Sequence, residues 1–458
     1  MKISKKVTLL ILIAVLILGI ACSPSIRAEK AAGDKHQAIK NVIVFIGDGM
    51  GNQQRRIAGI VQGDGNPANR LSFEKFQAVG LATNQSADAL VTDSAASATA
   101  LSSGYKTNNH MLGVSPDGKK KPTILEACKK QGKSTGLITT VAITHATPAG
   151  FGAHEADRKK QLNIAPQYLE NNIDVLLGGG KGEFTTKEMG GEREDGKNLI
   201  DAYKKAGYTL VENLTQLNEI KNGKSAKILG LFAMGDMDYE IDRNKSEQPS
   251  LAEMTETAIN TLGKNPKGFF LMVEAGKVDW ACHGNDVAGS VHDTLALDAA
   301  VKKALDFQKK HPETLIIVVN DHETGGLAIT QQVNIRAIQQ LKATTGKMAQ
   351  MMKKDGSNID EIFKTYAGIT DLTTRERTVI ADELSGKSKM EDEWGYGASI
   401  ISKVVCKRTG INFATGGHTG TPVVLVAEGP GASIFSGQYD QTDIPKKIAQ
   451  LLGIKFPF

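Results

Sequence analysis

Cysteines are scarce in this chain: 4 among 458 residues. Cys22 lies near the N-terminus, and Cys128, Cys282 and Cys406 follow at long spacings. Besides Cys22, the remaining three cysteines are an odd number at wide spacings, which is not the framework of a disulfide-stapled protein. The three could supply one disulfide, and the sequence does not choose the pair.

A strong charge of one sign is also absent. Without residues 1–22, which hold three lysines and no acidic residue, the formal charge of +5 falls to +2. This balance is too weak to predict a nucleic-acid partner or an anionic membrane partner. Charge content is ordinary, glycine is aperiodic and no long heptad pattern occurs, which excludes disorder, collagen and coiled coil. The length allows a large buried core.

The N-terminus has the features of a processing segment. Lys2, Lys5 and Lys6 precede an apolar run at 7–21, which is shorter than the ~20 residues of a membrane-spanning helix. A basic start, a short apolar core and small residues at its end predict an export signal over 1–22. The residues before Cys22 resemble a bacterial lipoprotein box with its leucine one place early. We expect either acylation of Cys22, with membrane anchoring, or cleavage between Ala21 and Ala28. Both outcomes predict an exported protein, periplasmic or extracellular.

Apolar runs of strand length alternate with helical patterns along the rest of the chain. The strand-like runs lie at 41–46, 134–140, 174–177, 227–232, 269–273, 314–319 and 423–427. The helical patterns lie at 122–130, 251–262 and 287–309. Several runs are apolar at nearly every position, as in strands covered on both faces. We therefore predict an α/β fold with a mainly parallel central sheet and helices on both faces.

Two segments differ from this alternation. Residues 23–40 are polar and small, and we interpret them as a tether leading into a domain over 41–458. Residues 331–408 are richer in Gln, Lys, Met and Glu and contain no strongly apolar strand. They predict a largely helical insertion, or cap, on the main domain.

Acidic residues lie within two positions after three of the strand-like runs: Asp48, Glu274 and Asp321, the last beside His322. Functional groups in open α/β sheets collect beyond the carboxyl ends of strands. A single acid at such a place is usually a turn or cap residue. Three converging carboxylates repel one another unless a cation lies between them. The pattern predicts a divalent metal site.

Further candidate ligands lie after Glu274. Asp279 and His283 are spaced i, i+4, so a helix would place both side chains on one face, where they can grip one ion. His418 lies in a glycine-rich loop at 416–420. Mixed histidine and carboxylate ligands suit zinc, whereas an all-oxygen shell suits magnesium.

A candidate nucleophile lies in the run of small residues at 91–100, VTDSAASATA. The run predicts a helix whose first turn begins near Ser94. A hydroxyl there faces unpaired backbone N–H groups and the positive end of the helix dipole, which favours phosphate. The alternative is a simple Thr or Asp cap on an alanine-rich helix. No G-x-S-x-G motif occurs, so Ser94 would need a metal ion to activate it.

Taken together, these residues resemble the alkaline phosphatase family. The matching stretches are 41–51, 91–101, 144–158, 273–283, 320–322 and 416–420. They occur in the family's order and span most of the chain beyond residue 40. The resemblance implies an alkaline phosphatase-like catalytic domain over 41–458 that hydrolyses phosphate monoesters, a homodimer, two zinc ions and a third metal, magnesium or zinc.

The resemblance also implies a role for each site residue. The first zinc would be held by Asp279, His283 and His418, the second by Asp48, Asp321 and His322, and the third ion by Asp48, Thr147 and Glu274. Ser94 would become phosphorylated, and Arg158 would clamp two phosphate oxygens with its planar guanidinium. These groups would act through a phosphoserine intermediate with broad specificity.

Two substrate-site positions depart from the best-known bacterial pattern of the family. His145 and Trp280 stand where that pattern has an aspartate and a lysine. Imidazole is a poor magnesium ligand, so His145 would bias the third site towards zinc. Trp280 removes a cation near the phosphate, so we expect weaker phosphate binding and faster product release.

Several alternatives remain at this point. A phosphodiesterase or sulfatase relative could use the same metal site, and an exported anion- or metal-binding protein would need no nucleophile. Cys282 adjoins His283 and is a minor candidate ligand. His154 and His292 are expected to be buried and hydrogen-bonded. The remaining histidines, His36, His110 and His311, are expected at the surface.

Overall fold

The computed structural model describes residues 39–221, 225–387 and 399–456. The predicted export signal, Cys22, His36 and all but the last two residues of the predicted tether lie outside the described residues. None of the helices in the described part is long and apolar enough to cross a membrane. Cys128, Cys282 and Cys406 are free thiols, so the structure contains no disulfide among the described cysteines.

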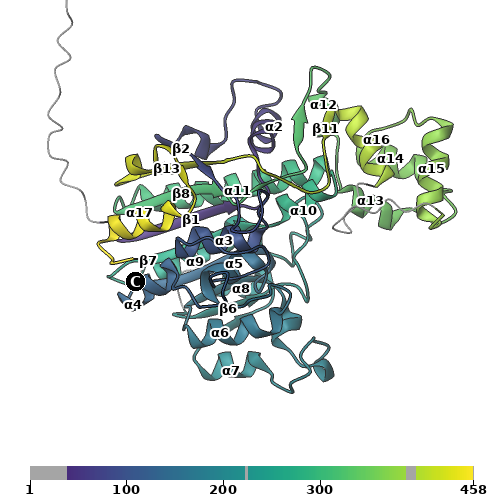
Figure 1. The fold of residues 1–458 in the computed structure, drawn as a ribbon. Coiled ribbons are helices and arrows are strands. Elements are labelled where there is room, and N and C mark those ends of the chain that lie inside the picture. Colours follow the sequence, from purple (N-terminus) through teal and green to yellow (C-terminus); the bar gives the residue numbers. More distant parts are fainter. Residues whose placement is uncertain (1–38, 222–224, 388–398, 457–458) are drawn as a thin grey trace, which may run out of the picture. The chain divides into compact units, whose positions relative to one another are not determined.

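A ten-stranded sheet forms the centre of the molecule (Figure 1), with the order β14-β2-β13-β8-β1-β7-β3-β4-β6-β5. Its strands are β1 (Asn41–Gly47), β2 (Ala78–Thr83), β3 (Ser134–Ala142), β4 (Val175–Gly179), β5 (Thr209–Val211), β6 (Ile228–Leu231), β7 (Phe269–Ala275), β8 (Thr314–Asn320), β13 (Val423–Glu428) and β14 (Gly437–Asp440). Only β13 runs antiparallel to its neighbours. The predicted mainly parallel sheet is therefore confirmed.

Helices cover both faces of this sheet (Figure 1). They are α2 (Asn52–Gln62), α3 (Ser94–Ser103), α4 (Ile124–Lys130), α5 (Ala146–Gly152), α6 (Ile164–Glu170), α7 (Leu199–Lys205), α8 (Leu214–Ile220), α9 (Leu251–Leu262), α10 (Lys277–His283), α11 (Val287–Gln308) and α17 (Asp443–Leu452). Alternate residues of β1 show the two layers. Val42 and Val44 pack in one core cluster with α4, α5 and α17. Ile43 and Phe45 pack in another with α9 and α11, because successive strand side chains point to opposite faces.

A third hydrophobic cluster lies beyond the sheet, where Figure 1 shows α13 to α16 to one side. Its helices are α12 (Ile335–Gln339), α13 (Thr345–Met351), α14 (Ile359–Ala367), α15 (Thr374–Leu384) and α16 (Ile400–Thr409). They lie in sequence between β10 (Leu327–Ile329) and β11 (Ile411–Phe413), which pair antiparallel. Val287 and Val291 of α11 join this cluster, so the helices share apolar packing with the main layer.

The nucleophile candidate lies at the start of α3. The side chain of Asp93 caps this helix by accepting a hydrogen bond from the backbone N–H of Ala96 at 2.9 Å, which satisfies one of the unpaired donors of the first turn. All ten residues of α3 are buried. Small side chains are needed because α3 packs closely on α5: a Cβ atom at Gly150 would lie 2.7 Å from Cβ of Ala98.

Candidate metal centre and nucleophile

Three neighbouring strands bring acidic side chains to one edge of the sheet. Strand β1 pairs with β7 and β8 in parallel register, with Ile46 opposite Glu274 and Gly47 opposite Asn320. Asp48 and Asp321 follow directly on these strand ends. The side chains of Asp48, Glu274 and Asp321 are fully buried. The structure thus brings the three carboxylates together.

The turn after β1 lets the chain approach helix α10 closely. Gly49 has a φ of +66°, and a Cβ atom there would lie 2.7 Å from Cα of Asp279. Its backbone N–H donates to Oδ1 of Asp321 at 3.1 Å. Only glycine meets both the left-handed conformation and the close contact without strain. This turn fixes Asp48 between the other ligands.

Three overlapping groups of side chains could hold metal ions, each with its ligand atoms within 4.8 Å of one another. The groups are Asp48, Asp321 and His322; Asp279, His322 and His418; and Asp48, His145 and Glu274. The first matches the set implied by the family resemblance for the second zinc. The third adds His145 to the two carboxylates expected at the third ion.

His283 also lies within the centre. The Nδ1–H groups of His283 and His418 donate to the backbone carbonyls of Gly416 at 2.5 Å and Thr92 at 2.9 Å. Their Nε2 atoms lie 3.1 Å apart, at 3.3 and 3.6 Å from the carboxylate of Asp279. A backbone hydrogen bond on one ring nitrogen fixes the tautomer and directs the other nitrogen to a metal. These three side chains therefore suit a zinc ion.

His322 joins the two halves of the centre. Its Nε2 lies 3.0 Å from Oδ2 of Asp321 and 3.4 Å from Oδ1 of Asp48. On the other side of the ring, Nδ1 lies 3.2 Å from the hydroxyl of Thr324, which in turn donates to Asp279. Burial lowers the pKa of His322, but Asp321 and Asp279 raise it more, so the net shift is upward.

Several buried polar atoms at the centre have no hydrogen-bond partner among the described residues. They are Oδ1 and Oδ2 of Asp48, Oδ2 of Asp321, Oε1 of Glu274, Oγ1 of Thr147 and Nδ1 of His145. Burial raises the pKa of Asp48 well above its usual range, and the carboxylates of Asp321 and Asp279 raise it further. Burial likewise raises the pKa of Glu274 to about 7. The free-energy cost of burying these carboxylates is removed when a divalent cation lies among their oxygens. The residues present therefore fit bound metal ions.

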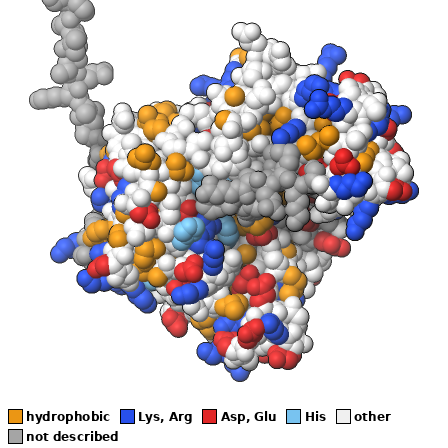
Figure 2. Space-filling view, turned by 45° about the vertical axis from the view of Figure 1, so that its right-hand side comes forward, with side chains coloured by type: hydrophobic (Ala, Val, Ile, Leu, Met, Phe, Trp, Pro, Cys, Tyr) orange, Lys and Arg blue, Asp and Glu red, His pale blue; other side chains and the backbone are white. Residues whose placement is uncertain are grey.

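Ser94, the first residue of α3, lies beside this centre. Its Oγ is 3.2 Å from Nε2 of His322, and the residue is 2% exposed. It opens into a cavity of about 430 Å³, lined by Ser94, His110, His145, Arg158, Lys159, Gln161, Asp279, Trp280, His283 and His418. Figure 2 shows histidine side chains beside lysine and arginine side chains on this face. The cavity therefore combines the nucleophile candidate with cationic groups.

Arg158 is held in this cavity by two partners. Its Nη1 donates to Oδ2 of Asp93 at 3.1 Å, and its Nη2 donates to Nε2 of His145 at 3.1 Å. Burial lowers the pKa of His145 to about 4, and the neighbouring Arg158 lowers it too. A neutral imidazole accepts from the guanidinium without repelling it. The two contacts fix the plane of the guanidinium at the cavity wall.

His110 was predicted to be a simple surface residue, and that description is incomplete. Its side chain is half exposed, but it lines the cavity. Its φ is +71°, which is uncommon outside glycine. The backbone N–H of His110 donates to Oδ2 of Asp93 at 3.0 Å, and its carbonyl accepts from the N–H of Arg158. No local pattern marks this residue, because the loop conformation that presents it depends on contacts with distant segments.

Other expected residues have structural roles. His154 is hydrogen-bonded at both ring nitrogens, to the carbonyl of Gly113 and to Glu126, as predicted. Cys282 is fully buried, and burial raises the pKa of its thiol to about 12. A neutral thiol is a poor metal ligand, and Cys282 belongs to none of the three ligand groups.

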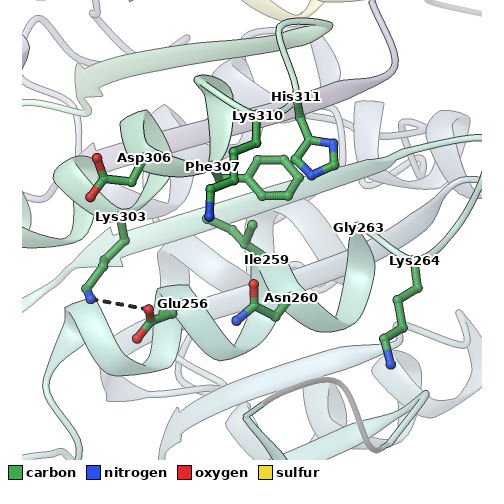
Figure 3. A pocket seen from close by; sticks show the side chains of 10 residues that line it. All are labelled: Glu256, Ile259, Asn260, Gly263, Lys264, Lys303, Asp306, Phe307, Lys310 and His311. Carbon is green, nitrogen blue, oxygen red and sulfur yellow. Dashed lines mark ion pairs between the residues drawn. The ribbon is translucent and has the colours of Figure 1, made fainter.

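A separate cavity of about 340 Å³ lies between α9 and α11 (Figure 3). It is lined by Glu256, Ile259, Asn260, Gly263, Lys264, Lys303, Asp306, Phe307, Lys310 and His311. An ion pair between Lys303 and Glu256 crosses it at 3.3 Å. No predicted site residue lines this cavity.

The fold and the site together define an α/β metallohydrolase with a serine at the N-terminus of a helix. A family profile described as alkaline phosphatase matches residues 39–454. The chain belongs to the alkaline phosphatase family, and it is accordingly a metal-dependent enzyme that hydrolyses phosphate monoesters.

Individual relatives agree with this assignment. The chain is 38% identical to alkaline phosphatase 3 of Bacillus subtilis (strain 168) over 443 residues, which cover 94% of this chain and 92% of the relative. The solved alkaline phosphatase of Thermus thermophilus is 30% identical with a TM-score of 0.81, covering 91% of this chain and 92% of that structure. A cold-active alkaline phosphatase from a psychrophilic Shewanella is 30% identical with a TM-score of 0.79, covering 90% and 99%.

Proposed function

We propose that this enzyme hydrolyses phosphate monoesters of broad specificity through a phosphoserine on Ser94, at a site with two zinc ions and a third metal. The observation that carries the proposal is the position of the Ser94 hydroxyl, 3.2 Å from His322 and at the N-terminus of α3. A phosphate at this position meets the backbone N–H groups of the first helical turn and the positive end of the dipole.

The metal ligands follow from the clusters at the sheet edge. The first zinc would be bound by Asp279, His283 and His418, and the second by Asp48, Asp321 and His322. The third ion would be bound by Asp48, Thr147 and Glu274. The third site would hold magnesium if only these oxygens bind, and zinc if His145 also contributes. When bound, the ions supply positive charge that lowers the pKa of nearby hydroxyl groups and neutralises phosphate oxygens.

The chain's own residues then perform two in-line displacements. Arg158 binds two phosphate oxygens through its planar guanidinium, which Asp93 and His145 hold in place. Ser94 loses its proton and attacks phosphorus, the bond to the ester oxygen breaks, and the alcohol leaves. Water then attacks the phosphoserine from the opposite side, releasing inorganic phosphate and restoring Ser94. Both attacks need a deprotonated oxygen, which favours alkaline pH.

Broad specificity follows from what touches the substrate. In this proposal the phosphate contacts Ser94 and Arg158, and the alcohol portion would lie towards Lys159 and Gln161, which also line the cavity. An alcohol group that makes few contacts is poorly discriminated. A phosphodiesterase using the same metal site is the competing function, and hydrolysis of diesters in preference to monoesters would favour it.

We further propose that the enzyme is exported and acts as a homodimer. The basic and apolar pattern at 1–22 supports export to the periplasm or the extracellular space. Cys22 would carry a lipid anchor if the lipoprotein box is used. The homodimer rests on the family resemblance alone.

The test of the proposed function is chemical trapping at Ser94. Enzyme incubated with labelled inorganic phosphate and quenched in acid should carry the label on the peptide containing Ser94. Ser94→Ala should lose both the label and at least 1,000-fold in kcat/KM, an order-of-magnitude expectation for a lost nucleophile. Ser103→Ala is a matched control in the same helix, because that hydroxyl bonds only to nearby backbone: it donates to the carbonyl of Thr99 and accepts from the N–H of Tyr105. Full activity in Ser94→Ala would overturn the covalent mechanism.

A further inference from the structure

Lys277, the first residue of α10, is a buried lysine close to the catalytic cavity. It is 5% exposed. Its ammonium lies 4.2 Å from the ring centroid of Trp280 and 4.8 Å from that of Tyr239. Both distances are within the range of cation–π attraction. Among the described residues no carboxylate lies within 4.0 Å of its Nζ, so the aromatic rings are its closest charge-stabilising partners.

The ammonium is costly to bury. Burial lowers the pKa of Lys277, against the pull of more distant carboxylates at Asp236 and Asp293. A methionine of similar length would fill the same space without the desolvation cost. The position of the charge between two rings therefore calls for a reason other than packing.

The Trp280 ring connects this lysine to the phosphate-binding groups. Trp280 lines the cavity at Ser94. Its ring meets the ring of His145 edge-on, with centroids 6.0 Å apart and planes at 68°. His145 in turn accepts a hydrogen bond from Arg158. A continuous set of contacts thus runs from the ammonium through the indole and the imidazole to the guanidinium.

We propose that Lys277 is a positioning residue for phosphate binding: its ammonium holds the Trp280 ring against His145 and thereby fixes Arg158. Lys277 is not among the residues that line the cavity at Ser94, so it would act on bound phosphate through Trp280 and not by direct contact. The inference rests on the proposed binding of phosphate in this cavity. The proposed mechanism gives Lys277 no role, so this inference adds a residue to those that control phosphate binding.

The first test is spectroscopic and needs no activity. The chain has two tryptophans, so Trp394→Phe leaves Trp280 as the sole indole. In that background Lys277→Met should shift or intensify the Trp280 emission, since the ammonium no longer contacts the ring. Lys277→Arg should keep the original emission, because guanidinium also stacks on indole. Lys303→Met, at the separate cavity between α9 and α11, is the control and should change nothing. Unchanged emission in folded Lys277→Met would overturn the proposal.

The second test measures inhibition by inorganic phosphate in the metal-loaded enzyme. Lys277→Met should weaken phosphate binding about fivefold or more, and Lys277→Arg should restore it to within about twofold. In a Trp280→Leu background the same lysine change should have no further effect, because the ring that transmits it is gone. Equal losses with and without Trp280 would overturn the proposal. Lys277→Gln serves in the same scheme if Lys277→Met does not fold.

The two tests separate this inference from the proposed function. If the wild-type enzyme forms no phosphoserine, the covalent mechanism fails while the emission test still stands. If the wild-type enzyme forms phosphoserine normally, but Lys277→Met changes neither the Trp280 emission nor the phosphate affinity, only the positioning role fails.

Discussion

Asp93 accepts a hydrogen bond from Nη1 of Arg158 at 3.1 Å through the same oxygen, Oδ2, that accepts from the backbone of His110. Its other oxygen caps helix α3 at Ala96. Burial raises the pKa of Asp93, but Arg158 and the cap lower it more, so the net shift is downward and the carboxylate stays ionised. One carboxylate therefore positions both the helix that carries Ser94 and the guanidinium that faces it.

Asp93→Asn separates these two roles. Asparagine caps helices as well as aspartate, so the thermal stability should change little. The charge-assisted bond to Arg158 is lost, and such bonds contribute about 1.5–3 kcal/mol. We expect the inhibition constant of inorganic phosphate to rise about tenfold or more. Asp117→Asn, at an exposed position, is the control. Unchanged phosphate inhibition would show that Asp93 does not position Arg158.

Trp280→Lys should strengthen phosphate binding. A cation placed about 4 Å from the phosphate gains about 1 kcal/mol even at the dielectric constant of water, which corresponds to about fivefold tighter inhibition by inorganic phosphate. Turnover should fall if product release limits the rate. The gain should be larger when Lys277→Met is added, because the two ammonium groups would otherwise repel each other. If Trp280→Lys left the affinity for inorganic phosphate unchanged, the prediction that Trp280 speeds the release of phosphate would be contradicted.

His145→Asp should shift the third metal site towards magnesium. Aspartate replaces an imidazole, which magnesium binds poorly, with a carboxylate oxygen. Titrating magnesium into the zinc-loaded variant should therefore activate it more strongly than the wild type. His311→Asn, remote from the cavity at Ser94, should respond like the wild type. Identical magnesium responses in His145→Asp and the wild type would contradict a role for His145 at this site.

Glu376→Gln should destabilise the packing of α15 against α16 in a pH-dependent way. Arg408 forms two hydrogen bonds to Glu376 at 3.1 Å, joining α15 and α16, and these contacts lower the pKa of Glu376 to about 2. A carboxylate whose pKa is lower in the folded state stabilises that state at pH values above its ordinary pKa. This stabilisation is lost as the pH falls. We expect a loss of about 1 kcal/mol at pH 7 that disappears between pH 4.5 and 2.

The measurement is urea unfolding of chelator-treated protein at several pH values, so that metal loss at low pH does not contribute. Glu361→Gln, at an exposed position on α14, controls for the loss of one negative charge. If the free energy of unfolding that Glu376→Gln loses stayed constant down to pH 2, the predicted role of the ionised Glu376 would be contradicted.

The central strands could be predicted from sequence because they are covered on both faces. The runs ending before Asp48, Glu274 and Asp321 are apolar at nearly every position, and this continuity distinguishes them from solvent-facing strands. Strand β2 was missed because its side chains alternate between buried and exposed and it contains Gly80. The antiparallel direction of β13 was not predictable either, since an apolar run carries no direction.

Some residues of the site could likewise be predicted from the sequence, and others could not. The ligands at strand ends and at i, i+4 on α10 could be found from position alone. Thr147 and Arg158 followed only from the family resemblance, because no local pattern marks them. Lys277 could not be found from sequence. A lysine is expected at the surface, and only the folded chain shows two aromatic rings around its ammonium.

The most direct test of this account is the metal content per chain, measured together with activity. The clustered carboxylates and imidazoles predict three bound ions per wild-type chain, and loss of activity in step with their removal by chelator. Asp48→Asn, which alters a ligand expected at two sites, should lower the content by more than one ion. A wild-type chain that is fully active with no bound metal, or with a single ion, would contradict the account.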